Sequence, residues 1–239
     1  MSRWWPERLV LTLGDESASG GGASALLDEA DRMLDRLQPR RGTRWLCVLA
    51  GEGVRYRLVP WADALTSLSQ RRRLAEHCFH EAYGEVARGW TVSVGPARYG
   101  AAALACAIDT ALLAGLEARA TARSLVLDGV RPLLTHALDG VRRRIARPLH
   151  WFVVMRGRRV TLLLRSPTEA LAVRQLPWGG SGLAELLDRE WFALGMTAPR
   201  CPVFVVGGPV VAEGWEVVDL TPAQSADAGR MDVGAMEAA

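Results

Sequence analysis

The chain has 239 residues, of which 49% are hydrophobic and 23% are charged, and its formal net charge is only +3. This composition is typical of a protein that folds around a buried core, and it excludes a chain that is disordered throughout. All basic residues are arginines in short, separate clusters, whereas a nucleic-acid-binding protein normally carries a basic stripe with a reading motif. We therefore predict no nucleic-acid partner.

The cysteines and the apolar segments indicate a reducing compartment. The cysteines are far apart, have no C-x-x-C spacing and lie mostly in apolar runs, which predicts buried free thiols. They are Cys47, Cys78, Cys106 and Cys201. The N-terminus lacks the apolar stretch of a signal peptide, and no apolar run reaches the roughly 20 residues that span a bilayer. We expect a cytoplasmic protein, in which any membrane association must come through a partner.

The first half of the chain alternates strands and helices. A strand at 8–13 is followed by a Gly-rich loop and by a helix at about 24–37. Strands at 44–50 and 54–61 flank Gly51-Glu52-Gly53, which predicts a tight hairpin. The helix at 67–83 is expected to stop at Gly84. The remaining predicted elements are strands at 90–94, 101–108 and 125–127, a helix capped by Asp109 that runs to 122, and a helix at 132–145.

The second half begins with three strands, at 151–155, 159–165 and 170–176. A helix at 182–194 and strands at 203–206 and 215–220 follow. Each half is thus predicted to contain a strand triplet followed by alternating helices and strands, which is a structural duplication without sequence repetition. We predict a first lobe at 1–148, in which the helix at 24–37 is an insertion, a second, smaller lobe at 149–221, and a disordered tail at 222–239.

This order resembles the actin-like ATPase architecture, an α/β fold of two ribonuclease-H-like lobes whose mixed sheets are flanked by helices. More narrowly, the chain resembles the PilM family of type IV pilus assembly, the MshI proteins and the cytoplasmic domain of the type II secretion protein GspL. The resemblance covers most of residues 5–220. It rests on VRYRLVPW at 54–61, EHCFHEAYG at 76–84, and LACAID at 104–109 followed by Leu112-Leu113.

The resemblance also implies where a nucleotide would bind. In nucleotide-binding members of the superfamily, an acidic, Gly-rich strand turn in each lobe holds metal and phosphates, and a Gly-Gly turn contacts the adenosine. Backbone N–H groups suit phosphate and a carboxylate positions the cation. Here the first turn contains Gly14, Asp15, Glu16 and Ser17, whereas the second, VMRGRR at 154–159, has no carboxylate. An arginine in place of a metal ligand removes the cation site.

Gly207-Gly208 matches the position of the adenosine turn by the same resemblance. A glycine pair that closes a connection after a strand is also ordinary turn chemistry, and we favour that interpretation. If nucleotide is bound, the cofactor-binding residues implied by the resemblance are Gly14, Ser17, Gly207 and Gly208.

Other catalytic or metal sites find little support in the sequence. His77 and His80 would supply only two zinc ligands, with no second pair evident at His136 and His150, so a structural or surface role is favoured. A Ser-His-Asp triad can assemble from distant positions, but no G-x-S-x-G elbow occurs. The GGSG run at 179–182 is better interpreted as a loop and N-cap. The nine tryptophans, several of them near predicted element ends, favour a partner-binding surface as a set.

We therefore predict a non-catalytic scaffold of a type IV pilus or type II secretion-like inner-membrane platform, with no cofactor and no metal. By resemblance, its partner is a PilN-like bitopic inner-membrane protein whose short cytoplasmic segment docks on it, and the assembly motor ATPase is a second candidate partner. One alternative is an ATP-binding protein with Mg whose slow hydrolysis is coupled to assembly. Another is a small-molecule enzyme on an unrelated fold, built on a single doubly wound sheet.

Overall fold

The computed structural model describes residues 7–14, 22–65, 67–145, 149–179 and 182–222. The predicted site residue Ser17 and the predicted disordered tail, apart from residue 222, lie outside the described residues. Within the described part of the chain, no helix is long and apolar enough to cross a membrane.

The chain forms two compact units. Unit 1 contains Met1–Val54 and Ile108–His136, and unit 2 contains Arg55–Ala107 and Ala137–Pro222. This division by contacts differs from the predicted domains, because the segment 55–107 groups with the second half of the chain. The boundary between lobes at 148 follows from the order of elements and stays a prediction.

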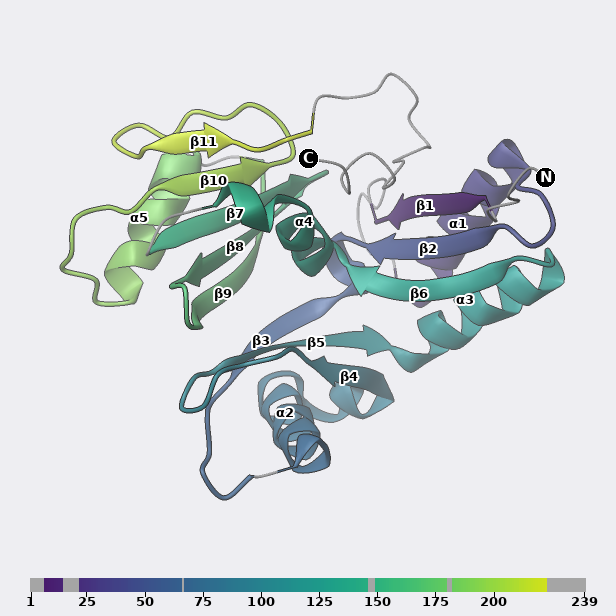
Figure 1. The fold of residues 1–239 in the computed structure, drawn as a ribbon, viewed down its shortest axis with the longest axis horizontal. Coiled ribbons are helices and arrows are strands. Elements are labelled where there is room, and N and C mark those ends of the chain that lie inside the picture. Colours follow the sequence, from purple (N-terminus) through teal and green to yellow (C-terminus); the bar gives the residue numbers. More distant parts are fainter. Residues whose placement is uncertain (1–6, 15–21, 66, 146–148, 180–181, 223–239) are drawn as a thin grey trace, which may run out of the picture. The chain divides into compact units, whose positions relative to one another are not determined.

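Unit 1 is built on three parallel strands in the order β1-β2-β6, which lie side by side in Figure 1. The strands are β1 (Arg8–Leu13), β2 (Arg44–Leu49) and β6 (Val126–Pro132). Every residue of β2 after the first is buried, as expected for a parallel strand that is covered on both faces. The flanking helices are α1 (Ala23–Leu37) and α3 (Thr110–Ala122). As predicted, Asp109 caps α3, since its carboxylate accepts the Ala111 N–H at 2.7 Å.

The predicted hairpin at Gly51-Glu52-Gly53 is wrong. These residues form a 3-10 turn, and β3 (Arg55–Val59) pairs antiparallel with β5 (Ala103–Asp109) in another sheet. The physical reason is that β2 already has parallel neighbours on both sides, so neither of its edges is left to pair with β3.

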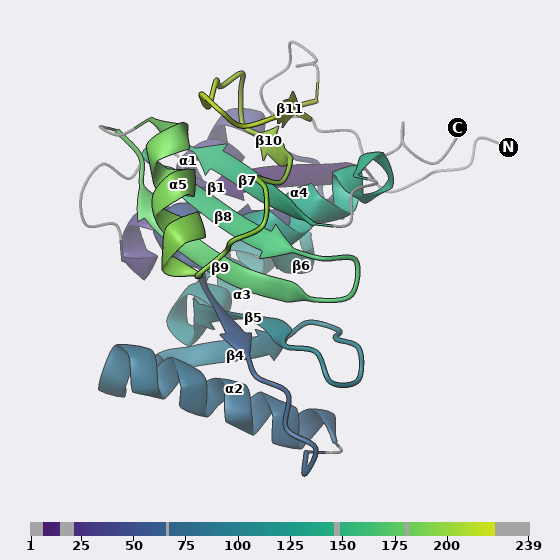
Figure 2. The same ribbon diagram turned by 90° about the vertical axis from the view of Figure 1, so that its left-hand side faces the viewer.

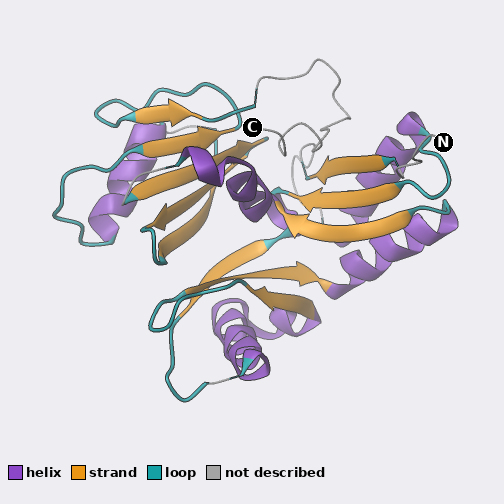
Figure 3. Cartoon of the chain, in the orientation of Figure 1, coloured by secondary structure: helices purple, strands orange, loops and turns teal. Residues whose placement is uncertain are grey.

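The smaller sheet of unit 2 has the order β3-β5-β4, with β4 at Trp90–Val94. Helix α2 (Leu68–Tyr83) packs against this sheet, and Phe79 lies fully buried in their common core. Figure 3 shows the helix beside the three strands. A capping box between Ser67 and Gln70 begins α2. The predicted stop at Gly84 is confirmed, where φ is +68°, and a 3-10 turn at Gly84–Gly89 leads to β4.

The larger sheet of unit 2 has the order β11-β10-β7-β8-β9. The predicted triplet is confirmed as an antiparallel meander of β7 (His150–Arg156), β8 (Arg159–Arg165) and β9 (Ala170–Pro177). Strands β10 (Val203–Val206) and β11 (Val217–Asp219) extend the sheet in parallel. Helix α5 (Leu183–Ala193) lies across the strands in Figure 2 and shares their core. The helical segments α4 (Leu133–Val141) and Arg142–Arg144 precede β7.

The two parallel-containing sheets differ in one respect that bears on function. In unit 2, β7 is followed by the β8-β9 hairpin and then pairs in parallel with β10. In unit 1, β1 pairs directly in parallel with β2, and only residues 14–22 separate β1 from α1. The third strand of the predicted first triplet, at 54–61, pairs with β5 in another sheet. The predicted strand triplet in the first half is therefore wrong, although the second half has it.

Candidate functional site

The predicted phosphate turn of unit 1 starts at Gly14, directly after β1. Gly14 has φ of +100°, and a Cβ there would lie 2.6 Å from the carbonyl oxygen of Ala50, so the backbone requires glycine. The Gly14 N–H donates to Oε2 of Glu29 at 2.8 Å. Glu29 lies on α1 and is buried. A buried carboxylate therefore already uses the backbone donor that a phosphate would need, and its negative charge opposes an anion there.

The predicted adenosine turn follows β10 in unit 2. The N–H groups of Gly207 and Gly208 both donate to Oγ1 of Thr221, each at 3.0 Å. The Thr221 N–H in turn donates to Oδ1 of Asp219 at 2.8 Å. Hydrogen bonds from the Thr221 side chain and backbone hold the pKa of Asp219 below its usual range. The glycine pair is thus closed by a side chain of the same unit.

The second predicted metal turn is the β7-β8 hairpin turn. Arg156 and Arg159 face each other across the ladder, and Gly157 between them has φ of +54°. The turn therefore presents arginines at its two ends, where the sequence already indicated no carboxylate. Among the described residues, no group of three or more His, Cys, Asp or Glu side chains could hold a metal ion.

The two histidines of α2 each lie beside a carboxylate instead of converging on one point. His77 Nε2 lies 3.4 Å from Glu81 Oε1, and His80 Nε2 lies 3.1 Å from Glu85 Oε1. Both pairs are largely exposed, and such pairs contribute little to stability. The structure thus supports the surface role that the sequence favours for His77 and His80.

The cysteines are free thiols, and their surroundings make them poor nucleophiles. Burial raises the pKa of Cys106 and Cys201 to about 11, and it also raises the pKa of Cys47. A thiol with such a pKa is only about 0.1% ionised at pH 8. We expect iodoacetamide at pH 8 to modify these cysteines slowly in the folded protein and rapidly in urea, as followed by mass spectrometry. Rapid modification of Cys106 in the folded protein would contradict this assignment.

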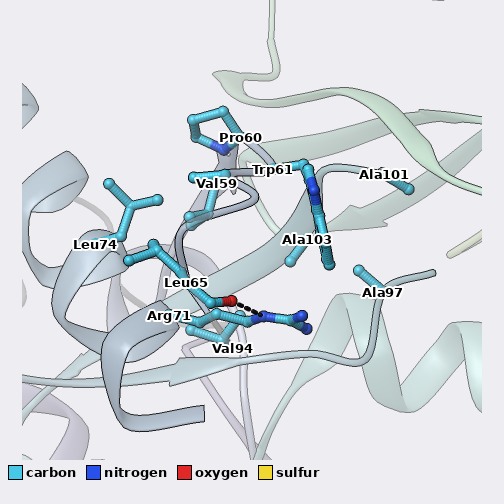
Figure 4. A pocket seen from close by; sticks show the side chains of 11 residues that line it. Val59, Pro60, Trp61, Leu65, Arg71, Leu74, Val94, Ala97, Ala101 and Ala103 are labelled. Atoms are coloured by element: carbon cyan, nitrogen blue, oxygen red, sulfur yellow. Dashed lines mark hydrogen bonds between the residues drawn. The ribbon is translucent and has the colours of Figure 1, made fainter. Parts of the chain in front are cut away.

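A further feature lies in unit 2, where β3 ends, α2 begins and the β4-β5 connection turns back toward β5. The side chains there form a shallow apolar depression, which we call the Trp61 groove (Figure 4). It holds about 300 Å³ of space, part of it open to solvent, and Arg71 is the charged residue that lines it.

Three side chains from separate segments fix Trp61 at this groove. The guanidinium carbon of Arg71 lies 4.4 Å from the centroid of the Trp61 ring. The Tyr99 ring packs edge-on against the Trp61 ring, with 4.8 Å between the two ring centroids. Oδ1 of Asp63 accepts from the Trp61 indole N–H at 2.8 Å and from the Tyr99 hydroxyl at 2.9 Å. The hydrogen bond from Trp61, and then that from Tyr99, hold the pKa of Asp63 below its usual range.

No protein-family model matches the sequence, and no curated protein matches it significantly. Solved structures do match the fold. A PilM-PilN type IV pilus biogenesis complex aligns with 78% of this chain and 68% of its own at 16% identity and a TM-score of 0.56. A protein of unknown function with an actin-like ATPase fold from Bacteroides thetaiotaomicron aligns with 84% of this chain and 82% of its own at 12% identity and a TM-score of 0.56.

The cytoplasmic domain of EpsL, an inner-membrane component of the type II secretion system of Vibrio cholerae, gives a TM-score of 0.50 at 14% identity and aligns with 91% of this chain and 89% of its own. The chain has the actin-like ATPase fold. The predicted resemblance to PilM-like and GspL-like proteins is thus confirmed at the level of the fold. The alternative of a single doubly wound sheet is wrong, because the strands of the actin-like chain fall into separate sheets in the described residues.

Proposed function

We propose that this actin-like protein is a non-catalytic cytoplasmic scaffold of a type IV pilus or type II secretion-like inner-membrane platform. In this proposal it binds the cytoplasmic segment of a PilN-like membrane protein and uses no nucleotide. The likeness in fold to a PilM-PilN complex and to the cytoplasmic domain of a secretion-system inner-membrane component supports this setting.

The main observation in support of a protein without nucleotide is that the N–H groups of both glycine turns already donate to side chains of the same chain. The Gly14 N–H is held by Glu29, and the Gly207 and Gly208 N–H groups are held by Thr221. A nucleotide would have to displace these partners, and at Gly14 it would have to approach a buried carboxylate. The short 14–22 segment and the arginine-rich β7-β8 turn support the same conclusion.

The second candidate function is slow ATP hydrolysis coupled to assembly, with Mg-ATP at Gly14, Ser17, Gly207 and Gly208. It requires ATP to replace Glu29 and Thr221 at the backbone donors. Such a replacement would appear as binding that depends on magnesium, so the two functions differ in a direct binding measurement.

A thermal-shift titration tests the proposal. A ligand that binds only the folded state stabilises it by about 2.7 kcal/mol when its concentration is 100 times its Kd. We expect the N-terminal cytoplasmic peptide of a PilN-like membrane protein to raise the Tm, and millimolar Mg-ATP to leave the Tm unchanged. A scrambled peptide and ATP with EDTA are the controls.

Two results would contradict the proposal in different ways. A magnesium-dependent rise in Tm with ATP would establish the ATP-binding alternative. No rise with the native PilN-like peptide, at concentrations where the protein remains folded and monodisperse, would remove the partner from the proposal.

A further inference from the structure

We propose that the Trp61 groove is a docking site for an acidic, aliphatic segment of a partner protein, in which one aliphatic side chain enters the groove and a neighbouring carboxylate meets Arg71. This site is additional to the proposed function and does not depend on it, because it is argued only from the groove within unit 2.

The shape and lining of the groove suit a single aliphatic side chain. Its walls are branched apolar side chains and its other surfaces are mostly alanines, which leave room above them. Val59 and Ala103 are buried beneath it, while Leu65 and Leu74 line it from the side of α2, as Figure 4 shows.

The charges around the groove favour a carboxylate beside that side chain. The Arg71 Nε donates to the Leu65 carbonyl oxygen at 3.5 Å, and its Nη atoms form no ion pair or hydrogen bond with another described residue. Arg98, in the β4-β5 connection beside Ala97, likewise has no ion pair with a described residue. A guanidinium with free N–H groups beside an apolar surface is well suited to bind a carboxylate.

The acidic residues of the same segment are already engaged. Residues 55–107 contain seven arginines and four carboxylates. Asp63 accepts from Trp61 and Tyr99, and the other three carboxylates pair with side chains of α2 and of the 3-10 turn that follows it. The positive charge left over therefore includes that of Arg71 and Arg98, so the groove is complementary to an acidic partner.

The residue types at the groove are those that contribute most to protein interfaces. Tryptophan, tyrosine and arginine are the residues that most often dominate the binding energy of such interfaces. Here Trp61 contacts both Tyr99 and Arg71. Leu68 and Tyr99 are each 83% exposed and belong to two of the three segments that form the groove. Apolar surface left open beside a pre-formed groove is typical of an interaction site.

Blocked peptides with defined charge test the docking site. The probes are ELDLE, the charge-inverted KLKLK and the apolar-deleted ESDSE, each added to the whole ¹⁵N-labelled chain. The readout is the indole N–H resonance of Trp61, assigned with Trp61→Phe. We expect ELDLE to shift this resonance and the other two peptides to leave it unchanged, since binding needs both the aliphatic side chain and the carboxylate.

Matched variants separate the groove from general electrostatics. Arg71→Glu should weaken ELDLE binding at least about tenfold, which corresponds to about 1.4 kcal/mol. Arg73→Glu makes the same charge change on α2 at an exposed residue that does not line the groove, and we expect near-wild-type binding. Ala97→Phe fills the groove and should abolish binding. Circular dichroism confirms that each variant is folded.

The docking site would be overturned if KLKLK bound as tightly as ELDLE. It would also be overturned if Arg71→Glu and Arg73→Glu weakened ELDLE binding equally. Self-association of the wild type in sedimentation velocity that Ala97→Phe abolishes would make a second copy the occupant. The test is independent of the proposed function, because the ELDLE result does not change whether or not the PilN-like peptide raises the Tm.

Discussion

Replacement of Gly207 by alanine is expected to lower the free energy of unfolding by at least about 3 kcal/mol, a loss that is large for a single substitution. Gly207 has φ of +124°, and a Cβ there would overlap the carbonyl oxygen of Met155. The backbone cannot move away easily, because Val206 pairs with Val154 in the β10-β7 ladder immediately before this turn. Urea denaturation followed by circular dichroism measures the loss.

Gly208→Ala is the matched control. Gly208 has nearly the same backbone angle, φ of +126°, but a Cβ there would have no atom within 4 Å. We expect a loss of about 1–2 kcal/mol from backbone strain alone. Equal losses in the two variants would contradict the overlap at Met155. A much larger loss for Gly207→Ala would mean that the packing of this turn against β7 is sufficient reason for the first glycine, without any nucleotide.

Most helices and strands could be predicted from the sequence because local signals decide them. Asp109 begins α3 and Gly84 ends α2, each through contacts with residues close in the chain. The alternating and fully apolar runs of the second half likewise predict β7, β8 and β10. Each of these signals lies within the element it specifies, so a single sequence is enough to find it.

Sheet membership could not be predicted in the same way. The segment 44–61 has the local pattern of a hairpin, but its strands pair with β6 and β5, which come much later in the chain. The competition between neighbours for the edges of β2 is a nonlocal effect. The resemblance to the actin-like fold supplied the fold class, but it did not reveal that the strand at 54–61 pairs with β5 and not with β2.

The residues that close the glycine turns were missed for related reasons. Glu29 lies three residues after Leu26 and one before Ala30, so it falls on the buried face of α1. A carboxylate within an apolar stripe is a detectable signal, because such residues are seldom buried without a partner. Thr221 has no comparable signal. The Trp61 groove combines three segments, and the sequence indicates only that Trp61 is near the end of a strand.

Glu29→Ala is expected to lower the free energy of unfolding by about 2–4 kcal/mol, because it removes a buried side chain and leaves the Gly14 N–H without its acceptor. Glu29→Gln keeps an acceptor oxygen at the 2.8 Å position while removing the negative charge, so we expect it to remain within about 1 kcal/mol of the wild type. Urea denaturation compares the variants, and hydrogen exchange at the Gly14 amide reports the bond itself. Equal stability of Glu29→Ala and the wild type would contradict the role assigned to this bond.

Glu29→Gln also separates two physical reasons for the proposed absence of nucleotide binding. If charge at Glu29 alone keeps phosphate away from Gly14, Glu29→Gln should gain a magnesium-dependent rise in Tm with ATP. If the short segment between β1 and α1 is decisive, Glu29→Gln should still give no shift, because a change of side chain does not lengthen this segment. We expect the second result, since a phosphate site built from backbone donors needs a turn of the right length as well as a favourable charge.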